Sequence, residues 1–140
     1  MEKKVMLTIT STQKFMTEEP EKTELVTEGT LSAADGAVEI SYQESELTGL
    51  EGTTTTFRVE DNKVTLVRRG AVNSRMSFEV GQEDRSLYDM GFGALMITIK
   101  TEQLRSNLTE NGGVFCVAYA ITIEEESAGW IEYRIDVRLK

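Results

Sequence analysis

The sequence contains no histidine, one cysteine and one proline among its 140 residues. Without histidine there is no imidazole base, no Ser-His or Cys-His pair for nucleophilic catalysis, and none of the common histidine metal sites. The lone Cys116 cannot form an internal disulfide, and nothing basic adjoins it in the sequence to favour a nucleophilic thiolate. We therefore expect no catalytic residue, no metal site, no cofactor and no enzymatic activity.

Positive charge is also scarce. Fifteen lysines and arginines stand against twenty-four acidic residues, which gives a formal net charge of −9. This balance argues against nucleic-acid binding, where clustered basic side chains supply most of the affinity, and against attraction to anionic membrane surfaces. No apolar run has the length of a signal-peptide core or a membrane span. The expected protein is cytoplasmic and binds neither nucleic acid nor membranes.

What the sequence does contain is a regular alternation of apolar and polar residues. Near the C-terminus, Ile131, Tyr133, Ile135 and Val137 alternate with charged residues, which is typical of a strand with one buried face. Glycine, asparagine and aspartate separate the alternating segments, as tight turns require. The pattern predicts ten strands, at about residues 4–16, 22–33, 37–47, 53–60, 63–69, 74–80, 84–90, 94–104, 113–124 and 130–139.

Short connections between these strands favour an antiparallel meander, in which consecutive strands pair. Closing such a sheet into a barrel removes both exposed edges. A barrel of about eight to ten strands either fills its interior with side chains or encloses one small ligand. The sequence thus predicts an all-β fold with one up-and-down antiparallel barrel over residues 1–140. The only helical expectation is a single turn at 104–108.

Two segments carry a resemblance to a known family: SYQESELTGLEGTTTTFRVEDNKVTLVRRGAVNSRMSFEVGQ (41–82) and LYDMGFGALMITIKT (87–101). The spacing of EGT, RxG, SxMxF and YDxxxGxL resembles the YwiB-like family of bacterial proteins of unknown function. Where such proteins often have a Thr-Pro-Tyr-Gly turn, this chain has Met-Gly-Phe-Gly at 90–93. The resemblance implies a calycin-like barrel, related in architecture to lipocalins, and no established activity. Calycins often bind a small amphipathic ligand, which is an analogy of fold alone.

Three arginines lie in the segment VTLVRRGAVNSRMSF at 64–78. Strict alternation places Arg68 on the inward face of its strand, and Arg69 and Arg75 on the solvent face. The same logic places Glu44 inward, at the end of an apolar strand face. A buried guanidinium requires an anion. Two readings remain open: Arg68 binds the carboxylate of a ligand, or it is structural, either solvated at the rim or paired with Glu44.

Hydroxyl groups provide the other candidate ligand contacts. Thr53 and Thr55 share the inward phase of their strand, and Tyr42, Tyr88 and Tyr119 are placed to direct hydroxyls into an interior. The competing interpretation is structural. Threonine has high β-propensity and often bonds the backbone, and buried tyrosines are usually core residues. The expected ligand site consists of Arg68, Glu44, Tyr42, Thr53, Thr55 and Tyr88.

Two functions follow from these patterns. The first is a small binding protein that holds an amphipathic or carboxylate ligand in the barrel, with Arg68 near its polar head. The alternative is a non-enzymatic structural or protein-interaction domain with a packed interior, homodimeric through outward-facing Val67, Ala71, Val72 and Phe92.

Overall fold

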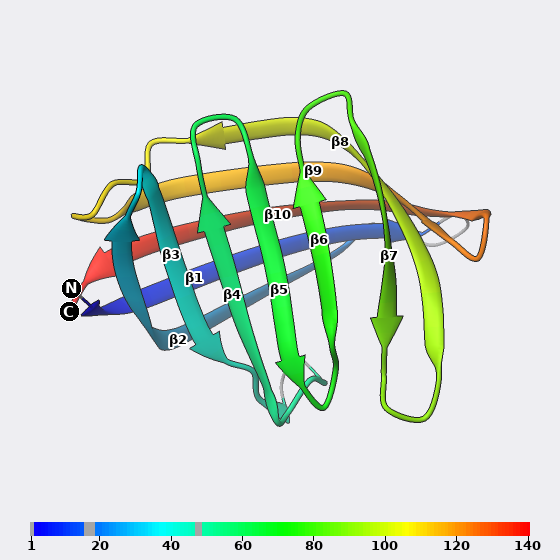
Figure 1. The fold of residues 1–140 in the computed structure, drawn as a ribbon, viewed down its shortest axis with the longest axis horizontal. Coiled ribbons are helices and arrows are strands. Elements are labelled where there is room, and N and C mark those ends of the chain that lie inside the picture. The colour runs from blue at the N-terminus through cyan, green and yellow to red at the C-terminus, as the bar shows by residue number, and fades with distance from the viewer. Residues whose placement is uncertain (1, 16–18, 47–48) are drawn as a thin grey trace.

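The computed structural model describes residues 2–15, 19–46 and 49–140. These residues form one ten-stranded antiparallel sheet, in the order β6-β5-β4-β3-β2-β1-β10-β9-β8-β7 (Figure 1). The strands are β1 (Glu2–Phe15), β2 (Glu21–Ala34), β3 (Ala37–Gln43), β4 (Thr53–Val59), β5 (Val64–Gly70), β6 (Ser74–Phe78), β7 (Glu83–Asp89), β8 (Ala94–Ser106), β9 (Gly113–Ile123) and β10 (Glu126–Leu139).

The sheet is a meander that nearly closes into a barrel. Because β1 pairs with β10, the two ends of the chain meet within the sheet, and the remaining seam lies between β6 and β7. At one end of this seam the backbones of Asn73 and Asp89 exchange two hydrogen bonds, of 2.8 and 2.9 Å. Further along, the carboxylate of Asp84 accepts a bond from the Ser77 amide, at 2.9 Å. The predicted all-β architecture is confirmed.

Most strand boundaries lie within two residues of the predicted ones, and the largest differences are the end of β3 and the start of β10, at Glu126 instead of 130. β3 ends at Gln43, so the predicted strand over 37–47 is shorter, and its last position lies outside the described residues, as does position 16. The helical turn expected at 104–108 is wrong. Leu104 and Arg105 instead continue β8 and pair with Val117 and Cys116 of β9. Pairing with a long neighbouring strand overrides the weak local preference of this segment.

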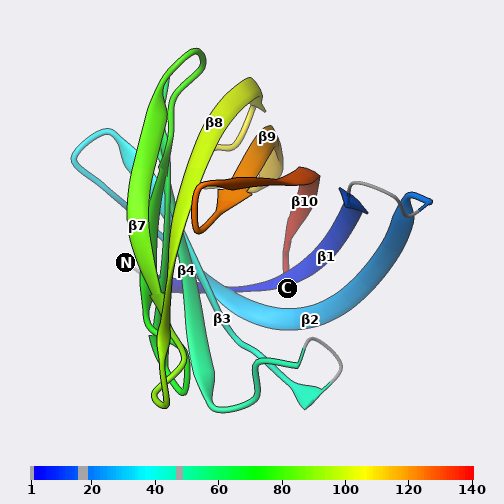
Figure 2. The ribbon, with the colours of Figure 1, turned by 90° about the vertical axis from the view of Figure 1, so that its right-hand side faces the viewer.

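The longest strands bend, which lets one sheet wrap around a single interior. Figure 1 shows β3–β7 running across the long strands β1, β2, β9 and β10, and Figure 2 shows β1 and β2 curving around the interior. Irregular pairing supplies two of the bends: Glu102 in β8 and Ala128 in β10 are each an extra residue in the ladder with β9. An extra residue of this kind bends its strand and increases the local twist.

One end of the interior is a dense apolar core. The ring of Phe57 packs edge-on against Phe115, with centroids 5.3 Å apart, and both side chains are 1% exposed. Apolar side chains from at least six strands surround this pair, among them Leu7, Leu31, Ile40, Leu66, Phe78, Ile99 and Ile135. The burial of these side chains supplies the main driving force for folding.

Glycine is required at position 29, where the pairing of β2 with β3 ends and the neighbouring atoms leave no room for a side chain. A Cβ atom at this position would lie 2.6 Å from the Ser41 carbonyl oxygen and 2.8 Å from Cδ1 of Leu7. We expect Gly29→Ala to lower the free energy of unfolding by about 1–3 kcal/mol, because the packed neighbours must move. Chemical denaturation measures this change. Gly93→Ala, whose Cβ would meet nothing within 4 Å, is the control. Equal stability of both variants would contradict the tight approach of β2 and β3.

Candidate functional site

A cavity of about 760 Å³ occupies the other part of the barrel interior. Its volume lies within the range of about 300–1,000 Å³ that is usual for small-molecule sites. Among the described strands, all but β4 contribute lining residues. Its apolar wall consists of Ile9, Leu25, Met76, Leu95, Ile97, Ile121, Ile123 and Ile131. A barrel packed solid with side chains, as the alternative function requires, would leave no cavity of this size.

The inward side chains of β1 explain where the core ends and the cavity begins. Val5 and Leu7 are fully buried in the core, whereas Ile9, Ser11 and Gln13 line the cavity. Alternation keeps all five on one face, but the residue type changes from apolar to polar along the strand. The interior therefore has an apolar packed end and a cavity whose far wall is polar.

Arg68 projects into this cavity from the end of β5. It is 8% exposed, whereas Arg69 and Arg75 are exposed, so the inward parity assigned to Arg68 is confirmed. Arg68 has no hydrogen bond or ion pair with another described residue, and its buried Nε is without a partner there. An unpaired buried guanidinium opposes folding, because burial removes the water that would solvate the charge.

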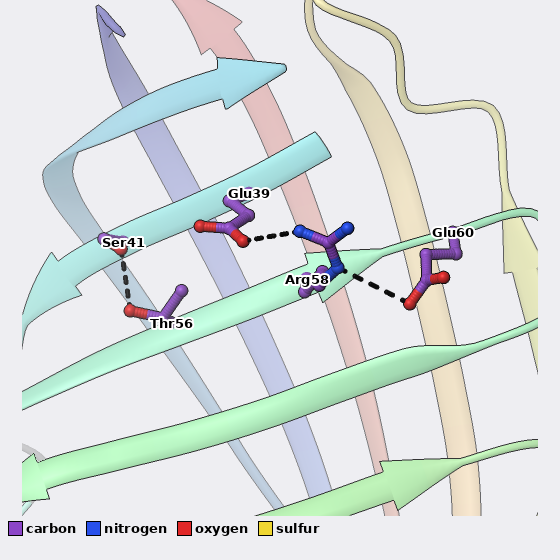
Figure 3. Close-up of polar contacts among 5 residues, drawn as sticks. All are labelled: Glu39, Ser41, Thr56, Arg58 and Glu60. Atoms are coloured by element: carbon purple, nitrogen blue, oxygen red, sulfur yellow. Dashed lines mark hydrogen bonds and ion pairs between the residues drawn. The ribbon is translucent and has the colours of Figure 1, made fainter. Parts of the chain in front are cut away.

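Arg58 on the exterior of the same sheet is paired, in contrast to Arg68. On the outer face of β3 and β4, Arg58 lies 2.8 Å from the Glu39 carboxylate and 3.6 Å from that of Glu60 (Figure 3). The hydroxyls of Ser41 and Thr56 bond each other nearby, at 2.7 Å. These contacts are partly solvated, and such surface ion pairs contribute about 0–1 kcal/mol.

All four tyrosines of the chain line the cavity around Arg68: Tyr42, Tyr88, Tyr119 and Tyr133. Ring contacts hold two of them in place. Tyr119 packs against Phe78 with centroids 4.8 Å apart, and Tyr119 and Tyr133 are stacked at 6.5 Å. A phenol combines an apolar ring with a hydroxyl that can donate to an anion. A cation with four phenol side chains around it is a favourable binding site for a carboxylate.

Burial keeps the phenols of Tyr42 and Tyr119 neutral. Burial is the main cause that raises the pKa of Tyr42 far above its ordinary value, and the nearby Glu44 carboxylate adds to the rise. Burial likewise raises the pKa of Tyr119, with Tyr133 contributing. For Arg68, burial lowers the pKa but the surrounding tyrosines raise it, and the net change is upward. Near neutral pH the cavity therefore holds the Arg68 cation together with the uncharged hydroxyl groups of Tyr42 and Tyr119.

Glu44 lines the same cavity but does not pair with Arg68. Its Oε2 accepts a bond of 2.5 Å from the Thr55 hydroxyl, and its backbone amide donates to the Thr53 carbonyl, at 2.9 Å. No ion pair joins Arg68 and Glu44 among the described residues. The internal pair that one of the open readings allowed is therefore not formed, and Thr55 instead binds the carboxylate near the end of β3.

The two candidate threonines support the cavity without lining it. Thr55 lies between Tyr42 and Arg68 in the ladder, and its hydroxyl orients Glu44. Thr53 is fully buried, and its hydroxyl accepts a bond of 3.2 Å from the amide of Val72 in the β5–β6 turn. The polar patch expected from Thr53 is therefore a backbone anchor, and the structural reading of threonine holds at this position.

The position of Val72 contradicts the expectation that this residue forms part of an exposed dimer surface. It is 8% exposed and therefore buried, because the bond from its amide to Thr53 folds the β5–β6 turn inward. Val67 is half-buried, and only Ala71 and Phe92 of that set are exposed.

Several lining residues escaped the sequence analysis. Tyr133 belongs to the apolar face of the last strand by alternation. Its inward position indicates a cavity-lining residue as clearly as the inward position of Tyr88 does. Ser11, Gln13 and Thr23 are polar residues at inward positions, a pattern that also marks a strand leaving the core. Glu24 lines the cavity but is itself exposed.

Within 2–15, 19–46 and 49–140, no three His, Cys, Asp or Glu side chains are grouped so as to hold a metal ion. The same residues include no helix of the length and apolarity needed to cross a membrane.

The buried tyrosines give a pH-dependent prediction. In the unfolded chain Tyr42 and Tyr119 ionise near the ordinary pKa of about 10, but in the folded protein their pKa values are higher. The stability linked to them is fully present below about pH 10 and falls as the pH rises above it, because the unfolded state releases these protons first. An ultraviolet absorbance titration should show these two phenols ionising only as the protein unfolds. Ionisation of Tyr42 and Tyr119 near pH 10 with the fold intact would contradict their burial.

The geometry defines a class of protein: a small, nearly closed up-and-down β-barrel with a cavity at one end of its interior. The chain belongs to the family described as a domain of unknown function, DUF1934, whose model matches residues 7–135. The resemblance to YwiB-like proteins inferred from the sequence is thereby confirmed.

Two comparisons with individual proteins agree with this assignment. The chain is 29% identical over 85 residues to the uncharacterized beta-barrel protein YwiB of Bacillus subtilis (strain 168). That alignment covers 61% of this chain and 58% of the relative. The crystal structure of the ywiB protein from Bacillus subtilis superimposes with a TM-score of 0.82 at 24% identity, covering 96% of this chain and 92% of the other. The latter likeness establishes the shared fold.

Proposed function

We propose that this protein binds one small amphipathic carboxylate inside its barrel, with the acid group at Arg68 and the apolar tail along the isoleucine wall. The observation that carries the proposal is Arg68 itself: a buried guanidinium without a described partner, facing a cavity of about 760 Å³. A bound carboxylate would supply the missing anion, and charge-assisted bonds of this kind are the strong ones.

The rest of the cavity supports this assignment. Its apolar wall suits an alkyl chain, and the phenols around Arg68 suit the oxygens of an acid. The barrel architecture is similar to that of calycin-like proteins, many of which bind such ligands, which is support by analogy alone. The proposal is for a binding protein without catalysis, located in the cytoplasm, where its free Cys116 would stay reduced.

A pair of ligands with opposite head groups tests the proposal. Isothermal titration calorimetry should show saturable one-to-one binding of decanoate and no binding of decylammonium, because Arg68 attracts the acid and repels the amine. Both ligands carry the same apolar tail, so the comparison isolates the head group. Equal binding of both ligands, or binding of neither, would overturn the proposal.

A further inference from the structure

The cavity holds a second buried polar group without a described partner. Glu44 is 7% exposed, and while its Oε2 accepts the Thr55 hydroxyl, its Oε1 has no hydrogen-bond partner among the described residues. A buried carboxylate oxygen left unpaired is costly, as is the unpaired Nε of Arg68. Two unpaired groups of opposite charge therefore face one cavity.

Both groups belong to residues that line the same cavity, and they do not form an ion pair. Tyr42, Thr55, Arg68 and Ser74 lie opposite one another in a row across β3, β4, β5 and β6. The Thr55 hydroxyl binds the Glu44 carboxylate, which anchors this carboxylate on the strand next to that of Arg68. A direct ion pair would need a nitrogen-to-oxygen distance of at most 4.0 Å, and no such pair is formed.

A separation of this kind suits a small head group that contacts both residues. A carboxylate bound to Arg68 spans about 2.8 Å from nitrogen to oxygen, and a hydroxyl or ammonium on the adjacent carbon adds a bond of about 2.7–2.9 Å to Glu44. A plain carboxylate would contact Arg68 but leave the acceptor oxygen of Glu44 unpaired. It would also place a second negative charge beside the buried Glu44, where burial weakens the solvent screening of the repulsion.

We infer that the ligand is a 2-hydroxy or 2-amino acid with an apolar tail, whose carboxylate binds Arg68 and whose hydroxyl or ammonium donates to Oε1 of Glu44. This inference rests on the proposed carboxylate site and specifies its ligand class. Thr55 is a positioning residue here, since its hydroxyl fixes which oxygen of Glu44 faces the ligand.

The test compares decanoate, 2-hydroxydecanoate and 2-aminodecanoate by calorimetry on the full chain. Both enantiomers of each substituted acid are measured, because the cavity is chiral. In the wild-type protein, the better enantiomer of at least one substituted acid should bind about 10- to 100-fold more tightly than decanoate, as expected for a bond to a charged acceptor. A preference for the hydroxy acid over the amino acid, or the reverse, identifies which donor the site selects.

Variants of two glutamates, one inside and one outside the cavity, assign the effect to Glu44. Glu44→Ala should reduce the preference to less than about twofold, since a donor on the ligand would have no acceptor left. Glu51→Ala is the matched control and should leave the preference unchanged, because Glu51 is exposed and does not line the cavity. If the alanine variant does not fold, Glu44→Gln takes its place in the test. It should lower the preference to less than half of the wild-type value.

The outcomes separate this inference from the proposed function. If decanoate binds as tightly as both substituted acids, or if the preference survives in the Glu44 variants, the inference is wrong while the carboxylate site stands. If none of the three acids binds, the proposed function itself is wrong.

Discussion

Replacing Arg68 with methionine is expected to stabilise the protein while weakening its binding of decanoate by about 10- to 150-fold. The loss of affinity corresponds to about 1.5–3 kcal/mol for hydrogen bonds to a charged group. The gain in stability arises because the variant no longer buries a guanidinium without a described partner. Replacing buried charges with apolar groups of similar size is neutral or stabilising by about 1–4 kcal/mol.

The neighbouring residue provides a matched control for this change. Arg69 precedes the same turn but is exposed, so Arg69→Met should change decanoate affinity by less than about twofold and stability by less than about 0.5 kcal/mol. Calorimetry and chemical denaturation measure the two quantities. A structural role for Arg68 predicts the opposite pattern, in which Arg68→Met loses stability. That result would remove the main argument for a ligand-binding arginine.

Phe57→Ala is expected to lower the free energy of unfolding by about 3–5 kcal/mol, the usual cost of deleting a large buried ring. Phe57 is 1% exposed and contacts Phe115 and Tyr133 edge-on, with centroids 5.3 and 6.4 Å away. It thus links the packed core to the cavity wall. Loss of its ring leaves a void in the core and removes one support of the Tyr133 ring.

Phe92→Ala is the control for this core variant. Phe92 is 90% exposed in the β7–β8 turn, so its removal should change stability by less than about 0.5 kcal/mol. Urea denaturation of both variants gives the comparison. A loss of less than about 1 kcal/mol in Phe57→Ala would mean that the interior is loosely packed at the end assigned to the core.

The strands could be predicted from the sequence because they depend on a local pattern. Alternation with a period of two identifies both the strand and its buried face, so the inward position of Arg68 followed directly. The turn residues between strands indicated short connections and hence the meander. The helical turn at 104–108 failed because no local signal reports that β9 is long enough to pair with Leu104 and Arg105.

The site was less accessible to sequence reasoning, because its geometry depends on distances between strands. Alternation placed Arg68 and Glu44 on inward faces but could not show that Thr55 binds Glu44 and keeps the two apart. Nor could it distinguish a cavity from a packed interior, since that depends on strand curvature and summed side-chain volume. Tyr133 went unnoticed as a site residue because a tyrosine within an apolar stripe reads as core.

The most direct test of the central claim is the NMR signal of the Arg68 side-chain Nε–H during a titration with decanoate. The signal is assigned by its absence in Arg68→Met, and burial should protect this proton from solvent exchange. We expect a saturable shift of this resonance on binding of one equivalent of ligand, while the Nε–H signals of the exposed Arg69 and Arg75 stay in place. An Arg68 signal that does not move while decanoate binds would contradict the account.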